Sequence, residues 1–129
     1  MGGSSYRDLA VWQKSMDMVV QCYEMARAFP ACETYGLTGQ IQRAAVSVPA
    51  NIAEGQARQH RKELLHHLSI AHGSTAELET HIEIAKRIGY IEAEVAQHLF
   101  SQTEEVGRMI NGLRKSLRQP RLPKGRPAN

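Results

Sequence analysis

Hydrophobic residues recur every three or four positions from Tyr6 to Arg118, the spacing of helices that bury one face. The first helical segment is predicted to end at Pro30. Its predicted inward positions are Leu9, Trp12, Met16, Val19, Tyr23 and Ala26. The third segment has the most regular repeat, and Gly89 follows it as the expected stop. Its predicted inward positions are Leu64, Leu68, Ala71, Thr75, Leu78, Ile82 and Ala85.

Two further helices are predicted, one on each side of this third segment. The second helix is expected to begin near Glu33 and Thr34, with inward positions Leu37, Ile41, Ala45, Val48 and Ile52. The fourth is expected to open near Glu92, with inward positions Val95, Leu99, Gln102, Val106, Met109 and Leu113. Nothing in the sequence alternates like a half-buried strand between turn signals. The pattern predicts an all-α fold, an antiparallel up-down-up-down four-helix bundle.

Three of the predicted helices carry more apolar residues than one inward stripe needs. The additional residues are Val11, Met18, Val20, Met25, Leu65, Ile70, Ile84, Ile88, Phe100, Ile110 and Leu117. A helix of a single bundle buries a stripe about 100° wide. A second apolar stripe indicates either a wider buried arc or a subunit interface. We therefore expect a homo-oligomer.

The second predicted helix also carries a polar stripe. Its members fall three or four positions apart on one helical face, and they are Arg43, Ser47, Asn51, Glu54 and Arg58. Pro49 removes a backbone donor, so a kink or local opening is expected there. On the third helix, Gly73 costs about 1 kcal/mol against Ala in a helix interior, which close packing or function should offset.

We predict that Arg43 and Glu54 are largely buried and paired with the third helix, where Glu77 and Glu79 are the nearest candidates. Together with Ser47 and Asn51 they would form a structural polar network that sets the register of the bundle. Catalysis by Arg43, Asn51 and Glu54 is the alternative, although no acid–base logic demands those three residues.

The segment from Gln40 to Gly55 reads QIQRAAVSVPANIAEG and is the most distinctive part of the chain. Shorter accompanying motifs are Leu9 with Trp12-Gln13, Phe29-Pro30 with Glu33, Tyr35-Gly36-Leu37, Ile70-Ala71 with Gly73-Ser74, Glu77-Leu78-Glu79 and Gly89-Tyr90-Ile91. In this order, over about residues 6–115, they resemble the four-helix-bundle proteins encoded in 23S rRNA intervening sequences.

That resemblance implies antiparallel four-helix bundles assembled as a barrel-like homopentameric ring. It also implies a relation to the accessory variability proteins of diversity-generating retroelements, which bind nucleic acid and the reverse transcriptase. A reverse transcriptase or a ribosomal component is therefore an expected partner in addition to further copies of the chain.

Basic residues are concentrated at the end of the chain. Of 16 basic residues in the whole chain, six lie in residues 114–129, which contain no acidic residue. Residues 1–113 contain the other ten basic residues and all 13 acidic residues. Their net charge is therefore −3, although the whole chain has a net charge of +3. The basic residues at the end are Arg114, Lys115, Arg118, Arg121, Lys124 and Arg126. They form either a solvated end or an arm that binds phosphates.

A second basic cluster, Arg58, Arg61 and Lys62, lies where the second predicted helix passes into the third. We expect residues 1–5 to be a flexible leader or tag remnant, residues 6–118 the bundle, and residues 119–129 a basic, Pro-rich disordered tail. Two cysteines are too few for a disulfide framework, and no apolar run is long enough to span a membrane, so a cytoplasmic protein without a membrane partner is expected.

A metal-dependent bundle enzyme is the weakest reading of the sequence. His60, Glu63, His66 and His67 lie within two turns, and Glu63 with His66 forms one E-x-x-H motif. Di-iron bundles need two such motifs and two further glutamates. Glycine-rich phosphate loops and nucleophile elbows do not occur in the sequence. We expect no bound metal and no cofactor.

The leading functional hypothesis is a non-enzymatic, oligomeric accessory protein that binds structured RNA or DNA through phosphate contacts. Arg58, Arg61 and Lys62 are the expected contacts together with the six basic residues from Arg114 to Arg126. The competing hypothesis is a protein–protein assembly module with no nucleic-acid role.

Overall fold

The computed structural model describes residues 5–118, which form four α-helices and two short 3₁₀ turns. The helices are α1 (Ala10–Ala26), α2 (Leu37–Ala57), α3 (Arg61–Arg87) and α4 (Ala93–Arg118), and the turns are η1 (Tyr6–Asp8) and η2 (Ala31–Glu33). Residues 5–118 contain no strand, as an all-α fold requires. The predicted leader and tail fall largely outside the described residues, although Ser5 accepts a hydrogen bond from the backbone N–H of Arg7 and caps η1.

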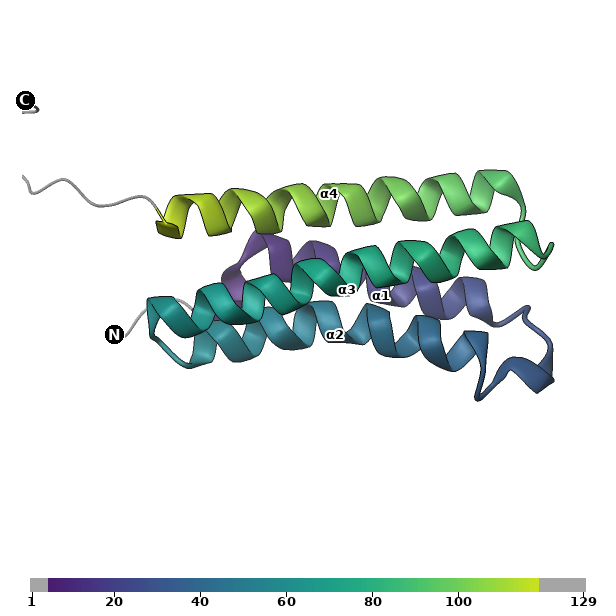
Figure 1. Ribbon diagram of the computed structural model, residues 1–129, viewed down its shortest axis with the longest axis horizontal. Coiled ribbons are helices and arrows are strands. Elements are labelled where there is room, and N and C mark those ends of the chain that lie inside the picture. The colour runs from purple at the N-terminus through teal and green to yellow at the C-terminus, as the bar shows by residue number, and fades with distance from the viewer. Residues whose placement is uncertain (1–4, 119–129) are drawn as a thin grey trace, which may run out of the picture.

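The four helices lie side by side along the long axis of the molecule (Figure 1). The α2–α3 turn, the start of α1 and the end of α4 lie at one end, here called the turn end. The α1–α2 and α3–α4 connections lie at the other end, here called the loop end. Helix α2 packs against α1 and α3, and α4 packs against α1 and α3, whereas the backbones of the diagonal pairs do not approach closely within the described chain.

The hydrophobic core contains the predicted inward positions of α2 and α3. In α3 these positions are buried from Leu68 to Ala85, and Leu64 is half-buried. In α2 the predicted residues from Ile41 to Ile52 are buried, and Leu37 is half-buried. Both helices carry a single dominant apolar stripe, so their inward faces follow directly from periodicity.

The inward faces of α1 and α4 differ from the prediction. The buried residues of α1 are Val11, Ser15, Met18, Cys22 and Ala26, and those of α4 are Ala96, Leu99, Thr103, Val106 and Ile110. Tyr23 and Val95, both predicted inward, are exposed. Each inward face includes one hydroxyl residue, Ser15 in α1 and Thr103 in α4. Ser15 donates to the Trp12 carbonyl at 2.8 Å, and Thr103 donates to the Glu79 carboxylate of α3 at 2.6 Å. A buried hydroxyl that is hydrogen-bonded costs little, so an apolar count alone selects the wrong stripe.

Helix α2 begins at Leu37 rather than near Glu33, because residues 31–33 form η2. The Glu33 carboxylate accepts hydrogen bonds from the Leu37 backbone N–H at 3.0 Å and from the Tyr90 hydroxyl at 2.7 Å. It thus caps α2 and joins the two connections at the loop end. Helix α2 runs without interruption through Pro49, which is buried, so the expected local opening is not found.

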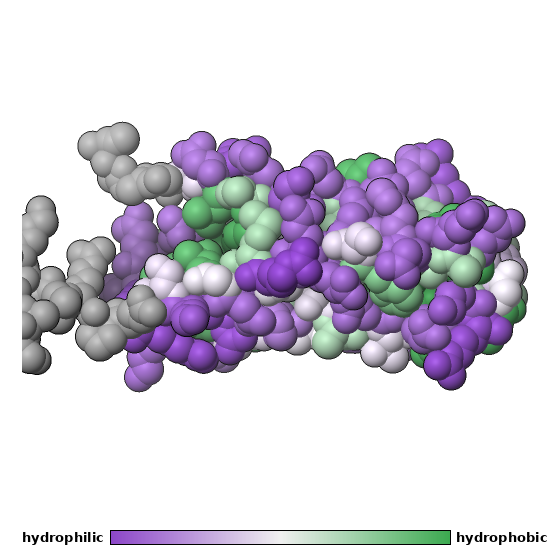
Figure 2. Space-filling view, turned by 90° about the horizontal axis from the view of Figure 1, so that it is seen from above, coloured by the Kyte–Doolittle hydropathy of each residue, from purple (hydrophilic) through white to green (hydrophobic). Residues whose placement is uncertain are grey.

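Polar side chains dominate the face seen from above in Figure 2, with apolar areas between them. Several large hydrophobic residues are exposed, and they are Met16, Val20, Tyr23, Tyr35, Val46, Ile70, Ile84, Ile88 and Val95. None of the described helices is long and apolar enough to cross a membrane.

Candidate functional site

The two predicted basic clusters lie at the same end of the molecule. Arg58 caps the end of α2, and Arg61 and Lys62 begin α3. Residues 114–118 form the last turn of α4 at the same turn end (Figure 1). The remaining predicted contacts, Arg121, Lys124 and Arg126, lie outside the described residues. Segments more than fifty positions apart in the sequence are thus brought to one end.

The charge of the turn end is strongly positive. Among the described residues within four positions of the helix ends, it holds eight basic against three acidic side chains, a net charge of +5. The basic residues are Arg7, Lys14, Arg58, Arg61, Lys62, Arg114, Lys115 and Arg118, and the acidic ones are Asp8, Glu54 and Glu63. By the same count the loop end holds three basic and five acidic residues, a net charge of −2.

The start of α3 adds partial positive charge to the turn end. Gln59 adopts a left-handed conformation with φ of 60° and turns the chain between the two helices. His60 follows as the N-cap of α3 and makes no side-chain capping bond. The N-cap side chain therefore does not accept from the first backbone N–H groups of α3, and the helix dipole favours an anion beside Arg61 and Lys62.

The basic residues differ in how far they are already neutralised. Arg58 donates to the Glu54 carboxylate at 2.8 Å and lies 3.7 Å from that of Glu63. The hydrogen bond to Glu54 raises the pKa of Arg58, and the same bond, followed by the charge of nearby His67, lowers the pKa of Glu54. Within the described chain no ion pair is found for Arg61 or Lys62. They are thus more available to a phosphate than Arg58.

The polar stripe of α2 contacts α3 through a chain of hydrogen bonds. The hydroxyls of Ser47 and Ser74 are 2.8 Å apart, and the Asn51 amide nitrogen donates to the Ser47 carbonyl at 2.9 Å. The Asn51 amide oxygen therefore accepts, and Nδ1 of His67 donates to it at 2.9 Å. Nε2 of His67 lies 3.9 Å from the Glu54 carboxylate. Ser47 and Asn51 thus join the two helices in the manner predicted for the stripe.

The predicted partners of this network are wrong. Arg43 and Glu54 are exposed, and neither pairs with Glu77 or Glu79 in the described chain. Glu77 lies 3.7 Å from His81, while the Glu79 carboxylate accepts a hydrogen bond from the Thr103 hydroxyl at 2.6 Å.

The actual contacts on α3 come from His67 and Ser74. His67 lies on α3, and only the α2–α3 turn brings it beside the polar stripe of α2. No local motif encodes the geometry of this turn, so the sequence did not indicate His67 as a partner of Asn51. The described residues contain no group of three or more His, Cys, Asp or Glu side chains placed to hold a metal ion.

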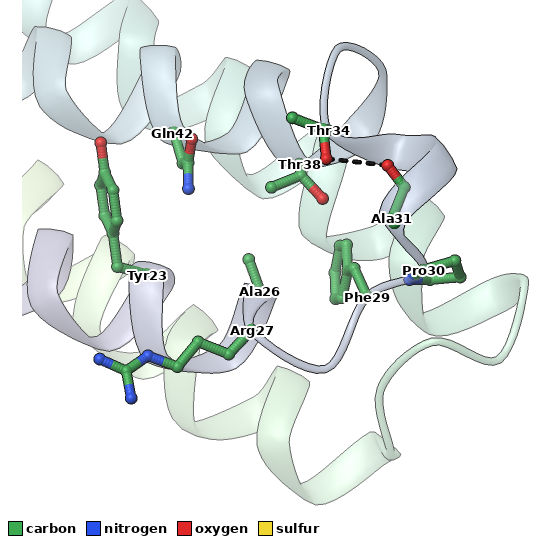
Figure 3. Close-up of a pocket in the computed structure, with 9 residues that line it drawn as sticks. All are labelled: Tyr23, Ala26, Arg27, Phe29, Pro30, Ala31, Thr34, Thr38 and Gln42. Atoms are coloured by element: carbon green, nitrogen blue, oxygen red, sulfur yellow. Dashed lines mark hydrogen bonds between the residues drawn. The ribbon is translucent and has the colours of Figure 1, made fainter.

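A groove runs between α1 and α2 toward the loop end. Tyr23 of α1 points toward Gln42 of α2 across it, and Thr34 donates to the Ala31 carbonyl at its margin (Figure 3). The groove continues past Tyr23 and Gln42 to Arg43 and Val46, where its volume is about 540 Å³. No carboxylate lines either part of this groove.

The family described as 23S rRNA-intervening sequence protein matches residues 7–112. A solved structure of a protein with unknown function from the S23 ribosomal protein family of Bacteroides thetaiotaomicron VPI-5482 is 25% identical in sequence. It has a TM-score of 0.74, and the match covers 82% of this chain and 99% of that one. Comparison with curated proteins gives no significant match. Because the family match spans most of the four helices, the chain belongs to the 23S rRNA-intervening sequence protein family.

Proposed function

We propose that this protein is a non-enzymatic cytoplasmic accessory protein that binds structured RNA or DNA through phosphate contacts at the turn end. The observation that carries this proposal is the meeting of residues 58–62 and 114–118 at one end of the bundle. The proposed up-down-up-down course of the helices brings them there. Arg121, Lys124 and Arg126 follow α4 in the sequence and add to the same charge.

Phosphate contacts are the form of binding that these residues favour. Arginine and lysine release counterions from a polyanion, which gives affinity without reading sequence. Trp12 lies against Tyr6 with ring centroids 5.3 Å apart, and both side chains are partly buried, so they offer little surface for base stacking. A ribosomal or reverse-transcriptase ribonucleoprotein is the proposed setting, in keeping with the family.

The test replaces Arg61, Lys62 and Lys115 with Gln in one variant. These three exposed side chains make no ion pair in the described structure, so the fold should be unaffected. Binding to duplex RNA and DNA is measured by gel shift between about 50 and 200 mM salt. If all three contact phosphates, the slope of log affinity against log salt should fall by about 2–3.

The matched control replaces Arg27, Lys86 and Arg87 at the loop end with Gln, which removes the same charge from the whole protein. The control should bind like the parent. Equal loss in both variants would mean that only net charge matters, and it would contradict a site at the turn end. A parent that shows no binding at low salt would favour the protein–protein assembly module instead.

We also propose that the protein acts as a homo-oligomer. The specific observation is the set of exposed large hydrophobic residues, since Val20, Tyr23 and Ile84 are 54%, 42% and 42% exposed. Covering such residues in a subunit interface removes apolar area from water. A ring of five chains is the form that the family resemblance implies. Sedimentation velocity at micromolar concentration tests this, and a monomer would refute it.

A further inference from the structure

Two charged side chains of opposite sign have no charged partner within the described chain. Arg43 of α2 has no carboxylate within ion-pair distance, and Glu79 of α3 has no cation, its recorded partner being the Thr103 hydroxyl. Each lines a groove of about 540 Å³, Arg43 between α1 and α2, and Glu79 between α3 and α4. We call these the Arg43 groove and the Glu79 groove.

Arg43 is exposed, and Gly39 leaves room for its guanidinium along α2. A Cβ at Gly39, one turn earlier, would lie 3.1 Å from Nη1 of Arg43 and 2.9 Å from the Thr34 carbonyl oxygen. Glycine at position 39 thus leaves the space in which the Arg43 guanidinium lies. Tyr23 and Val46, 42% and 41% exposed, flank it in the same groove. The Arg43 groove therefore combines one cation and exposed apolar side chains with the uncharged polar residues Thr34, Gln42 and Ser47.

The Glu79 groove has the complementary character. Glu79 and Glu83 line it with Ile84 and Phe100, and Ile84 is exposed. Glu83 already pairs with Arg87 at 2.8 Å and with Lys86 at 3.6 Å. Glu79 is thus the carboxylate of this groove that lacks a cation.

The two grooves lie at the same level of the bundle. Arg43 is six residues from the start of α2, and Glu79 is eight residues from the end of α3, both counted from the loop end. At about 1.5 Å per residue these depths are about 9 and 12 Å. Each helix packs closely against two neighbours, in the cyclic order α1, α2, α3, α4. The groove between α1 and α2 and the groove between α3 and α4 therefore lie on opposite sides of the bundle. Two parallel copies standing side by side would therefore bring one groove to the other.

We propose that the Arg43 groove docks the α3–α4 face of a second copy of this chain, with Arg43 paired to Glu79 of that copy. This inference rests on the proposed self-association and names the surfaces that carry it. The contact is heterologous, because different faces meet, so a pair of copies keeps one free α3–α4 face and one free Arg43 groove for further copies. The pairing satisfies both unpaired charges and covers Tyr23, Val46 and Ile84 in one interface.

The test is charge reversal followed by sedimentation velocity. Arg43→Glu and Glu79→Arg should each raise the dissociation constant of the assembly at least tenfold, and the double reversal should restore most of the loss. Glu79→Gln, which can still accept from Thr103, provides a milder variant in case the reversal unfolds the chain. Circular dichroism checks the fold of every variant. Asp17→Lys, an exposed charge reversal on α1 outside both grooves, should leave assembly unchanged.

The outcomes separate the two proposals. A parent chain that is monomeric at micromolar concentration would overturn self-association and this interface together. An oligomeric parent whose assembly survives both single reversals would overturn the interface alone and leave the groove to another occupant. A double reversal that is no better than the singles would likewise overturn the pairing. Restoration by the double reversal supports it.

Discussion

Replacing Gly55 with Ala tests the closest approach of α2 to α3. A Cβ at this position would lie 2.8 Å from Cβ of His67, 3.1 Å from Cδ1 of Leu64 and 3.3 Å from Cα of Leu64. Two of these three atoms belong to or adjoin the α3 backbone, so a side-chain rotation cannot clear them. Helix α3 would have to move away from α2, and this movement would take His67 out of hydrogen-bond distance of Asn51.

The size of the effect follows from two opposing contributions. Alanine in a helix interior is favoured over glycine by about 1 kcal/mol. Overpacking a well-packed contact costs about 1–3 kcal/mol. The free energy of unfolding of Gly55→Ala should therefore range from unchanged to about 2 kcal/mol lower.

Gly73→Ala is the matched control on α3. A Cβ at Gly73 meets no atom within 4 Å, so this variant should gain the helix propensity of about 1 kcal/mol. Gly112→Ala on α4, equally open, repeats the control on another helix. Urea unfolding at two protein concentrations gives the free energies and detects any contribution from assembly. A Gly55→Ala variant as stable as Gly73→Ala would refute the close approach.

Three further predictions concern single contacts. Ser47→Ala and Ser74→Ala should each lower the free energy of unfolding by about 1 kcal/mol, and the double variant by clearly less than the sum, as measured in a urea double-mutant cycle. The hydrogen bond from the Leu37 N–H, followed by that from the Tyr90 hydroxyl, lowers the pKa of Glu33. The ionised Glu33 carboxylate should therefore stabilise the fold above the ordinary carboxyl pKa, and this stabilisation should be lost as pH falls through the lowered pKa. Tyr90→Phe should thus lower the melting temperature at pH 7 and not at pH 2. Burial raises the pKa of Cys22 to about 12, so a thiol reagent at pH 8 should label one cysteine per native chain and two in urea.

The sequence predicted some inward faces and missed others for a physical reason. In α3 the regular three-and-four repeat continues through the whole helix, whereas the additional apolar residues do not, so periodicity alone identifies Leu68, Leu78 and Ile82 as core. In α1 two stripes compete, and the one that is buried contains Ser15, which an apolar count rejects. The choice depends on the surfaces of α2 and α4 that face α1, and these are absent from the local pattern.

The candidate site divides in the same way. The basic residues are visible in the sequence, because charge is a property of each residue and the helix order places their segments. The surroundings of Arg43 and Glu79 are not visible in the sequence, since they depend on which side of its helix each long side chain lies. The role of Gly39 could not be predicted from the sequence, because it depends on the Thr34 carbonyl oxygen and the Arg43 guanidinium that lie beside it. Gly73 was expected at a close helix contact, yet the close contact is at Gly55.

The opposite charges of the turn end and the loop end give the molecule an electric dipole along its length. Helix α3, with 27 residues, is about 40 Å long, whereas the Debye length is about 10 Å at 0.1 M salt. In dilute salt the field of a polyanion acts on both ends and rotates the protein before contact, so that the basic end arrives first. At physiological salt each end is screened separately, so this torque disappears, whereas the proposed short-range phosphate contacts would persist. Association rates should therefore fall with added salt before dissociation rates change.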